Sequence, residues 1–322
     1  TQLNAQFLFF AGWSDLQGAL GGNVATTSVA RGAQASAAAE RKVAGPAATS
    51  LGLPPPLPAG AAAKGLLSYT VKGPLSGITA SVVVQLPPGY SSPANARERY
   101  PVIETFGGYP GVPAQFMRTL NLGGLIADAV SAHQMRSALL VAPQVQIPLG
   151  VDTECVNGEP SKPQIETWLA EDVPNWIART FRINTERSSW ATMGLSAGGW
   201  CAAMATMLHP AQYSAAVVLG GYFHPDFGPY YEAFPKTSPL ETRYDLVKLS
   251  SHPPPVALWL ETSHADALSY SSSARLLHTA RPPMAVNAVV LQQAGHRTSV
   301  WKAVLPTALL WLGHNIPGFR PG

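Results

Sequence analysis

Short β-branched runs alternate with helical patterns along the chain from about residue 66 onward. This alternation is typical of a mostly parallel sheet that helices cover on both faces. The sequence predicts eight strands, at Leu67–Val71, Ile78–Gln85, Val102–Phe106, Ala138–Ala142, Trp190–Met193, Ala215–Leu219, Val256–Glu261 and Val286–Leu291. It predicts helices between them, at Gly123–His133, Ile165–Thr180, Gly198–Leu208, Ser271–Thr279 and Ser299–Leu312. We therefore expect an α/β fold, and eight strands suit the sheet of an α/β-hydrolase.

The first 65 residues have a different composition. Ala, Gly, Ser, Thr and Pro dominate from about Gly18 to Gly65, including the run Pro54–Pro56. Such a segment buries little apolar surface, which indicates a linker or a loosely docked arm. A short helix through Ala33–Val43 is the alternative, because that stretch contains good helix formers. We expect an arm over 1–65 and one catalytic domain over 66–322.

Charge and hydropathy exclude some partners and favour one location. The chain of 322 residues has a net charge of +3, and no run of Lys and Arg gathers that charge into a stripe, so we do not expect nucleic acid as a partner. No stretch approaches the roughly 18 consecutive apolar residues of a membrane-spanning helix. Thr1 is not an initiator residue, which leaves open that an upstream signal peptide or membrane anchor has been removed. With 12% charged residues and an Ala/Pro-rich arm, the sequence indicates a secreted or extracytoplasmic protein, membrane-tethered if such an anchor exists.

A nucleophile motif follows the predicted strand at Trp190–Met193. Gly194, Ser196 and Gly198 form the pattern G-x-S-x-G directly before a predicted helix. In the strand–turn–helix context this pattern predicts a sharp turn that lifts the serine hydroxyl above the sheet, while the glycines leave room for crowded backbone. The alternative is a Gly-rich turn that only packs closely. We predict that Ser196 is a catalytic nucleophile.

A serine hydroxyl needs a base, and the base needs an acid to orient it. His296 lies just past the last predicted strand and just before the last predicted helix, where this fold places its base. Asp266 lies in the loop after the preceding strand and is the favoured acid. Glu261, near the end of that strand, is the main alternative, and Asp245 is a distant third. The predicted triad is Ser196, Asp266 and His296.

An oxyanion hole requires two backbone N–H groups that point at the developing charge. Ala197 follows the nucleophile directly and is expected to supply one. The Gly-rich loop Phe106–Gly111, after the predicted strand Val102–Phe106, is expected to supply the other. The sequence favours Tyr109 or Gly108 as this second donor and does not separate them.

The chain has two cysteines, Cys155 and Cys201. They are too few for a four-ligand zinc site and do not form a C-x-x-C redox pair, and we expect no metal. One disulfide or two inert thiols are the choices that the sequence leaves. An exported protein would retain a disulfide, so we predict a bridge between them.

With these residues placed, the chain resembles the putative-esterase family of α/β-hydrolases, which includes esterase D and the secreted mycolyltransferases. The resemblance runs from about Leu67 to Gly313. It implies an acyl-enzyme mechanism on carboxyl esters or thioesters with Ser196 and His296 in their family roles, and neither metal nor cofactor. Phe106 departs from the family, because many relatives have His or Asp before the oxyanion glycine. The segments that carry the resemblance are Pro101–Ile103, Gly107–Tyr109, Asp152–Cys155, Asp172–Pro174, Gly194–Gly199, Leu208–Pro210, Gly295-His296 and Trp301.

Substrate contacts are expected from an aromatic-rich loop, Gly221–Phe234, and from the helix after the nucleophile. Aromatic faces bury a large area at low entropy cost, which suits the wall of an acyl pocket. Trp200, Tyr222 and Phe223 are the candidate substrate-binding residues, and the alternative is that these rings only pack the loop onto the sheet. The loop is too short for a large lid domain. We therefore expect an open cleft suited to lipid, polyester or glycan-linked esters.

The sequence as a whole predicts a serine carboxyl-ester hydrolase. An acyltransferase of the mycolyltransferase kind would use the same triad and is the main alternative. A serine peptidase of the prolyl-oligopeptidase kind would need a large upstream propeller domain, which the arm over 1–65 is too small to supply. A non-catalytic binding module would tend to lose a triad member, and all three candidates are present. The expected partner is a small-molecule or polymeric ester, and the sequence does not determine the oligomeric state.

Overall fold

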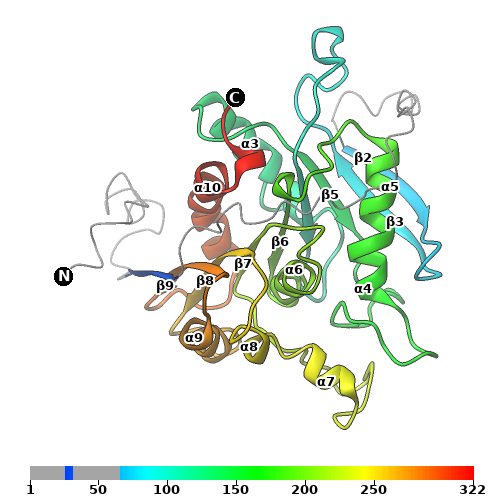
Figure 1. Ribbon diagram of the computed structural model, residues 1–322, viewed down its shortest axis with the longest axis vertical. Coiled ribbons are helices and arrows are strands. Elements are labelled where there is room, and N and C mark those ends of the chain that lie inside the picture. Colours follow the sequence, from blue (N-terminus) through cyan, green and yellow to red (C-terminus); the bar gives the residue numbers. More distant parts are fainter. Residues whose placement is uncertain (1–25, 32–65) are drawn as a thin grey trace.

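A single nine-stranded sheet forms the centre of the molecule (Figure 1). The computed structural model describes residues 26–31 and 66–322. The strands lie side by side in the order β1-β9-β8-β7-β6-β4-β5-β3-β2. Their bounds are β1 Thr26–Arg31, β2 Leu66–Lys72, β3 Thr79–Gln85, β4 Val102–Phe106, β5 Leu139–Pro143, β6 Trp190–Leu195, β7 Ala215–Leu219, β8 Ala257–Ser263 and β9 Ala285–Leu291.

The middle of the sheet is parallel and its edges are antiparallel. Six neighbouring strands pair in parallel, in the order β5-β4-β6-β7-β8-β9. The strands β3 and β2 at one edge of the sheet, and β1 at the other, pair antiparallel. The eight predicted strands are confirmed, with ends shifted by at most two residues. β1 is a ninth strand that the sequence did not predict, and it falls inside the segment interpreted as an arm. The rest of that segment, including Ala33–Val43, lies outside the described residues, so the division at residue 65 stays a prediction.

Helices connect the parallel strands, and a final helix follows the last of them. They are α2 Gln115–Arg118, α3 Leu122–Ser131, α4 Ile165–Thr167, α5 Val173–Thr180, α6 Ala197–Leu208, α7 Pro239–Arg243, α8 Leu246–Leu249, α9 Tyr270–Thr279 and α10 Thr298–Asn315. All five predicted helices are present, although a π-helical turn at Trp168–Asp172 joins α4 to α5. The sequence missed α2, α7 and α8, which at four or five residues are too short to show a hydrophobic period.

The helices form one layer on each face of the sheet (Figure 1). Successive residues of a strand point to opposite faces, so Val102 belongs to the core beneath α5 and α6, and Ile103 to the core beneath α3 and α10. Both side chains are fully buried. Burial on both faces explains why these strands read as continuous apolar runs rather than as alternating ones.

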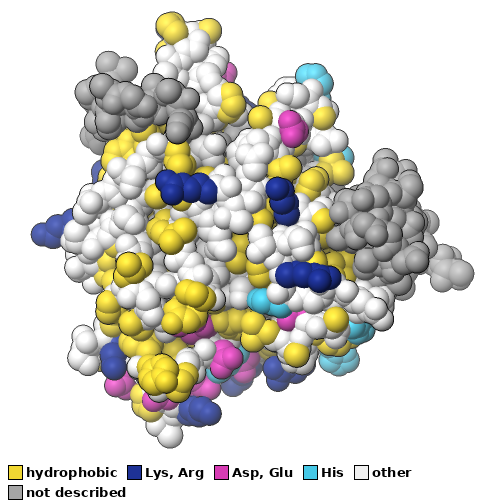
Figure 2. Space-filling model, turned by 180° about the vertical axis from the view of Figure 1, so that it is seen from behind, with side chains coloured by type: hydrophobic (Ala, Val, Ile, Leu, Met, Phe, Trp, Pro, Cys, Tyr) yellow, Lys and Arg dark blue, Asp and Glu magenta, His cyan; other side chains and the backbone are white. Residues whose placement is uncertain are grey.

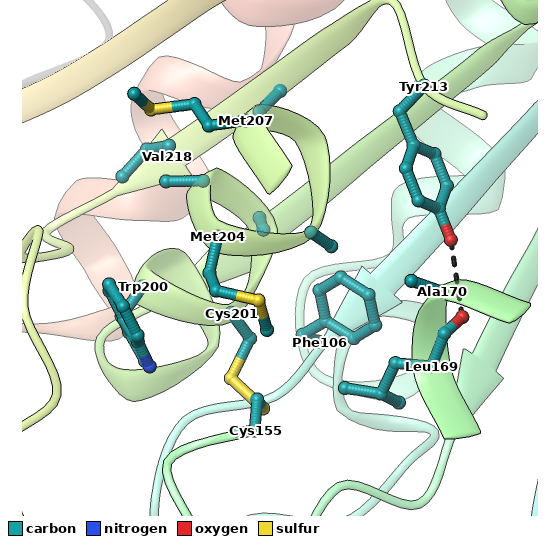
Figure 3. Close-up of a cluster of buried hydrophobic side chains, with 14 of the residues drawn as sticks. Phe106, Cys155, Leu169, Ala170, Trp200, Cys201, Met204, Met207, Tyr213 and Val218 are labelled. Atoms are coloured by element: carbon teal, nitrogen blue, oxygen red, sulfur yellow. Dashed lines mark hydrogen bonds between the residues drawn. A yellow bond between two sulfur atoms is a disulfide. The ribbon is translucent and has the colours of Figure 1, made fainter. Parts of the chain in front are cut away.

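The predicted disulfide between Cys155 and Cys201 is present, with a Cα–Cα distance of 5.6 Å. It joins the connection after β5 to helix α6, which begins directly after Ser196. Figure 3 shows the bridge beside Met204 in the core under α6. The helix that follows the nucleophile is thus covalently tied to a neighbouring loop.

The carboxyl ends of the parallel strands place the predicted triad at one edge of the sheet. Ser196 follows β6, Asp266 follows β8 and His296 follows β9. Because these strands are parallel, the three loops emerge on the same side, where α/β proteins bind their ligands. The oxyanion loop after β4 emerges at this edge as well.

The surface shows no concentrated basic region on the face in Figure 2, where Lys and Arg side chains are scattered. Among the described residues, no helix is both long enough and apolar enough to span a membrane.

Candidate active site

Ser196 occupies a strained turn between β6 and α6. Its backbone has φ 56° and ψ −127°, a conformation that a non-glycine residue adopts only where the surroundings enforce it. Gly194 and Gly198 make the turn feasible. A Cβ at Gly194 would collide with the carbonyl of Gly198, and a Cβ at Gly198 would collide with the carbonyl of Phe106. The turn therefore has the crowded geometry of a nucleophile elbow.

The three predicted triad side chains form a continuous hydrogen-bonded chain. The imidazole Nε2 of His296 lies 2.8 Å from the Ser196 Oγ, and its Nδ1 lies 2.8 Å from Oδ2 of Asp266. These distances suit a base that takes the serine proton and an acid that holds the ring. Trp301 of α10 packs its indole against the imidazole at a centroid distance of 4.9 Å and near-perpendicular planes. The His296 ring thus has an aromatic contact in addition to the hydrogen bonds at both nitrogens.

The Asp266 carboxylate is buried and fully hydrogen-bonded. Oδ2 accepts from the Ser269 hydroxyl at 2.7 Å in addition to His296, and Oδ1 accepts from the backbone N–H groups of Leu268 and Ser269. Burial alone would raise the pKa of Asp266, but the hydrogen bonds from His296 and Ser269 outweigh it and lower the pKa below the usual range. The carboxylate is therefore charged where it can stabilise an imidazolium.

The two alternative acids, Glu261 and Asp245, lie in surroundings that differ from those of Asp266. Strand β8 runs to Ser263, so Glu261 lies inside the sheet and is fully buried. Burial and the nearby charge of Asp266 raise the pKa of Glu261 to about 8, so this carboxyl is neutral at pH 7. Asp245 caps α8, where its side chain accepts from the Lys248 N–H at 2.9 Å. Of the three carboxyls, only that of Asp266 is hydrogen-bonded to His296.

A buried hydroxyl that the sequence analysis did not single out links the acid loop to the histidine loop. The Oγ of Ser263 accepts from the Ala265 N–H at 3.2 Å, the Ala294 N–H at 3.0 Å and the Gly295 N–H at 3.4 Å. Ser263 is the last residue of β8 and its side chain is fully buried. The only sequence signal is a serine that ends an apolar strand just before the acid, which is too weak to act on without the structure.

The loop after β4 lies against the nucleophile. A Cβ added to Gly108 would come 3.1 Å from the Ser196 Cβ. The Gly108 N–H already donates to Oε1 of Gln115 at 3.2 Å. The Tyr109 and Ala197 N–H groups have no acceptor among the described residues, and Ala197 is the first residue of α6. Of the two donors that the sequence left open, Tyr109 is therefore the one with a free N–H.

A family model described as "Putative esterase" matches residues 77–312. The chain belongs to this family. The expected enzyme class, a carboxylic ester hydrolase, is thus confirmed at the level of the family.

One curated relative matches part of the chain, and solved structures match its fold. An uncharacterized protein of Corynebacterium glutamicum, Cgl0967/cg1104, is 27% identical over 143 residues, which are 44% of this chain and 33% of that protein. The chain thus matches about one third of that relative's length. A ferulic acid esterase structure has a TM-score of 0.63 at 17% identity, covering 78% of this chain and 98% of the other. An S-formylglutathione hydrolase from Agrobacterium tumefaciens has a TM-score of 0.64 at 14% identity, covering 78% and 95%. The two structural likenesses support the α/β-hydrolase fold expected from the sequence.

The three predicted substrate-binding side chains lie in the core. Trp200 and Phe223 are fully buried and Tyr222 is 7% exposed. The Trp200 Nε1 donates to the Glu154 carbonyl, and the Tyr222 hydroxyl donates to the Glu154 carboxyl at 2.6 Å. Their rings stack in near-parallel planes. These contacts correspond to the packing alternative, so the assignment of these residues to the substrate is not supported.

No group of three or more His, Cys, Asp and Glu side chains in the described ranges is placed to hold a metal ion.

Proposed function

We propose that this protein hydrolyses carboxyl esters through an acyl-enzyme on Ser196, with His296 as general base and Asp266 as the acid that orients it. The observation that carries the proposal is the unbroken chain of contacts from the Ser196 Oγ through His296 to Asp266, both at 2.8 Å. Membership of an esterase family supports the same reaction class.

Each step of ester hydrolysis has a catalytic group in position. His296 Nε2 takes the Ser196 proton as the hydroxyl oxygen attacks the ester carbonyl, and the Asp266 carboxylate stabilises the imidazolium that results. The free N–H groups of Ala197 and Tyr109 stabilise the negative carbonyl oxygen. His296 then returns the proton to the leaving alcohol. A water molecule, deprotonated by the same imidazole, attacks the acyl carbonyl. The bond to the Ser196 Oγ then breaks, the acid is released and His296 returns the proton to the serine oxygen.

Exposed apolar side chains at the edge of the sheet that carries the triad indicate an apolar substrate. Six large apolar side chains in the described part of the chain are exposed, and five of them lie in loops that follow the carboxyl ends of β4, β5, β7 and β8. Residues 106–117 and 143–151, which contain three of the five, include no Asp, Glu, Lys or Arg. An uncharged rim of this kind favours an acyl or polymer chain over a charged ligand. We infer a lipid or polyester ester, with a glycan-linked ester as the other candidate. The five side chains are Tyr109, Val112, Leu149, Tyr230 and Leu268.

Acyl transfer is a second candidate, supported by a hollow in the loop between β7 and β8. The hollow has a volume of about 720 Å³, and its walls include the rings of Phe227, Tyr230 and Tyr231 as well as charged groups such as Lys162 and Asp226. Aromatic faces beside polar groups suit a polyhydroxylated acceptor, because a sugar ring can stack and hydrogen-bond at once. Transfer to such an acceptor would use the same triad.

We infer that the protein is secreted or extracytoplasmic. The disulfide between Cys155 and Cys201 supports an oxidising compartment, because disulfides rarely persist in the cytosol of mesophiles.

Labelling with a fluorophosphonate and turnover of an ester series test the nucleophile. Wild-type protein is expected to label and to turn over aryl and alkyl esters, and Ser196→Ala is expected to lose both while its melting temperature stays close to that of the wild type. Ser299→Ala, an exposed serine at the start of α10, is the matched control and should label normally. Labelling that persists in Ser196→Ala would contradict the proposal.

Product partitioning separates hydrolysis from transfer. With a soluble ester donor and alcohols or sugars at millimolar concentration, hydrolysis predicts that free acid is the main product, since water reaches the acyl-enzyme without a binding site. Transfer requires that a bound acceptor outcompete water. Holding the acceptor in line with the acyl carbon can be equivalent to an effective concentration of about 10⁵ M or more. If one sugar captures most of the acyl group, the protein is an acyltransferase.

A further inference from the structure

Two glutamine side chains hold the peptide groups of the oxyanion loop. Gln115 Oε1 accepts from the Gly108 N–H at 3.2 Å. Gln146 Nε2 donates to the Gly108 carbonyl at 3.4 Å, and Gln146 is buried. The two come from different connections, Gln115 from the start of α2 and Gln146 from the segment after β5.

The Gly108 carbonyl belongs to the same peptide plane as the Tyr109 N–H. In a trans peptide the C=O and N–H bonds point in opposite directions, so a donor that holds the carbonyl also sets the direction of the N–H. Gln146 therefore sets the direction of the Tyr109 N–H, which is free to bind the oxyanion. Gln115 fixes the preceding peptide, which leaves the plane little freedom to rotate.

Further hydrogen bonds hold the segment that carries Gln146. The Gln144 side chain donates to the Gln146 carbonyl at 2.9 Å, and the Thr153 hydroxyl donates to the Val145 carbonyl at 2.9 Å. The Tyr109 hydroxyl donates to the Gly150 carbonyl at 3.1 Å, which ties the oxyanion loop to the segment after β5 a second time. The loop and its neighbouring segment thus form one hydrogen-bonded unit beside Ser196.

We propose that Gln146 and Gln115 are positioning residues that orient the Gly108–Tyr109 peptide so that the Tyr109 N–H is the second donor of the oxyanion hole. The proposal rests on the proposed function and adds to it the residues that preorganise the charge-stabilising site. Preorganisation matters because a donor aimed at the developing charge contributes to the transition state and little to the ground state.

The test uses Gln146→Met and Gln115→Met, which keep side-chain length and remove the hydrogen bonds. Each is expected to lower kcat by on the order of 10- to 100-fold, since loss of a whole donor typically costs about 100-fold or more. KM should stay within about twofold, because the ground-state carbonyl gains little from the donors. Gln164→Met is the matched control. Gln164 lies in the same connection after β5, but its side chain bonds the carbonyls of Gly158, Glu159 and Lys162 instead of the oxyanion loop.

A transition-state analogue supplies a readout that a purely structural role would not move. A trifluoromethyl ketone forms a hemiketal oxyanion on Ser196, so its affinity should fall by the same factor as kcat/KM in both variants. The affinity of the alcohol product, which carries no negative oxygen, should not change. If kcat and the ketone's affinity both stay within twofold of wild type, the proposal is wrong. If a Met variant does not fold, Gln146→Asn and Gln115→Asn replace it, with the same expectations.

The outcomes also separate this proposal from the proposed function. Wild-type protein that neither labels nor hydrolyses esters would overturn the proposed function. Wild-type protein that does both, with glutamine variants that match it, would overturn the positioning roles alone.

Discussion

The hydroxyl oxygen of Ser263 lies 3.0 Å from the backbone nitrogen of Ala294, two residues before His296. The same oxygen also accepts from the N–H of Ala265, one residue before Asp266. One side chain at the end of β8 thus sets the distance between the loop that carries the acid and the loop that carries the base.

Ser263→Ala should lower both stability and turnover. The change leaves the buried Ala294 N–H without its acceptor, which costs about 1–3 kcal/mol, and it frees the two loops to shift relative to each other. We expect a lower free energy of unfolding by denaturant and a lower kcat. Ser273→Ala is the matched control, because the buried Ser273 hydroxyl has no hydrogen-bond partner in the described structure. Equal losses in the two variants would contradict the role of Ser263.

Asp266→Asn should cost far more activity than Glu261→Gln. An amide at position 266 would favour the wrong imidazole tautomer, and in a serine–histidine–aspartate triad this costs on the order of 10⁴-fold in kcat. Glu261 is already neutral at pH 7, so its amide changes little at the reaction centre. Steady-state kinetics of both variants on one ester provide the measurement. The reverse ranking would assign the acid role to Glu261.

Removal of the disulfide should lower stability but spare the chemistry. The bridge spans 46 positions, and the chain-entropy model gives a loop of this size about 4 kcal/mol. Cys155→Ala with Cys201→Ala should therefore melt well below the wild type and stop responding to reductant, while kcat stays similar because neither cysteine contacts the triad. Thermal melts of both proteins with and without reductant test this. Equal melting temperatures in the absence of reductant would show that the bridge contributes nothing.

The order of elements and the triad could be predicted because they follow from local patterns. Ser196, Asp266 and His296 each stand where a strand gives way to a loop or helix, and the parallel sheet brings those loops to one edge. The choice between Tyr109 and Gly108 could not be made, because it depends on Gln115, whose contact with Gly108 results from the folded path of the loop. The direction of the Trp200 and Tyr222 side chains could not be predicted for a similar reason. Composition shows that rings are present, but only the packing against Glu154 shows which way they point.

The sensitivity of the fold to acid should come from Glu166. This carboxylate of α4 is buried, and burial alone would raise its pKa, but hydrogen bonds from His209, Arg243 and Tyr244 lower the pKa to about 2. The folded state thus favours the charged form relative to the unfolded chain, in which the pKa is about 4.3. Its contribution to stability is present in full above about pH 4.5 and is lost as the pH falls toward 2, and it is on the order of 3 kcal/mol.

Glu166→Gln should therefore reduce the free energy of unfolding at pH 7 and flatten its decline between about pH 4.5 and 2, because the group that titrates in that window is gone. Denaturant titrations at pH 7, 5, 4 and 3 measure both effects. Glu171→Gln, an exposed carboxyl in the turn that follows α4, is the control and should leave the curve almost unchanged. The Arg243 guanidinium that contacts Glu166 has a side-chain exposure of 46%, so water partly compensates its charge in the variant. A decline in stability below pH 4.5 that is as steep in Glu166→Gln as in the wild type would mean that other carboxylates govern acid unfolding.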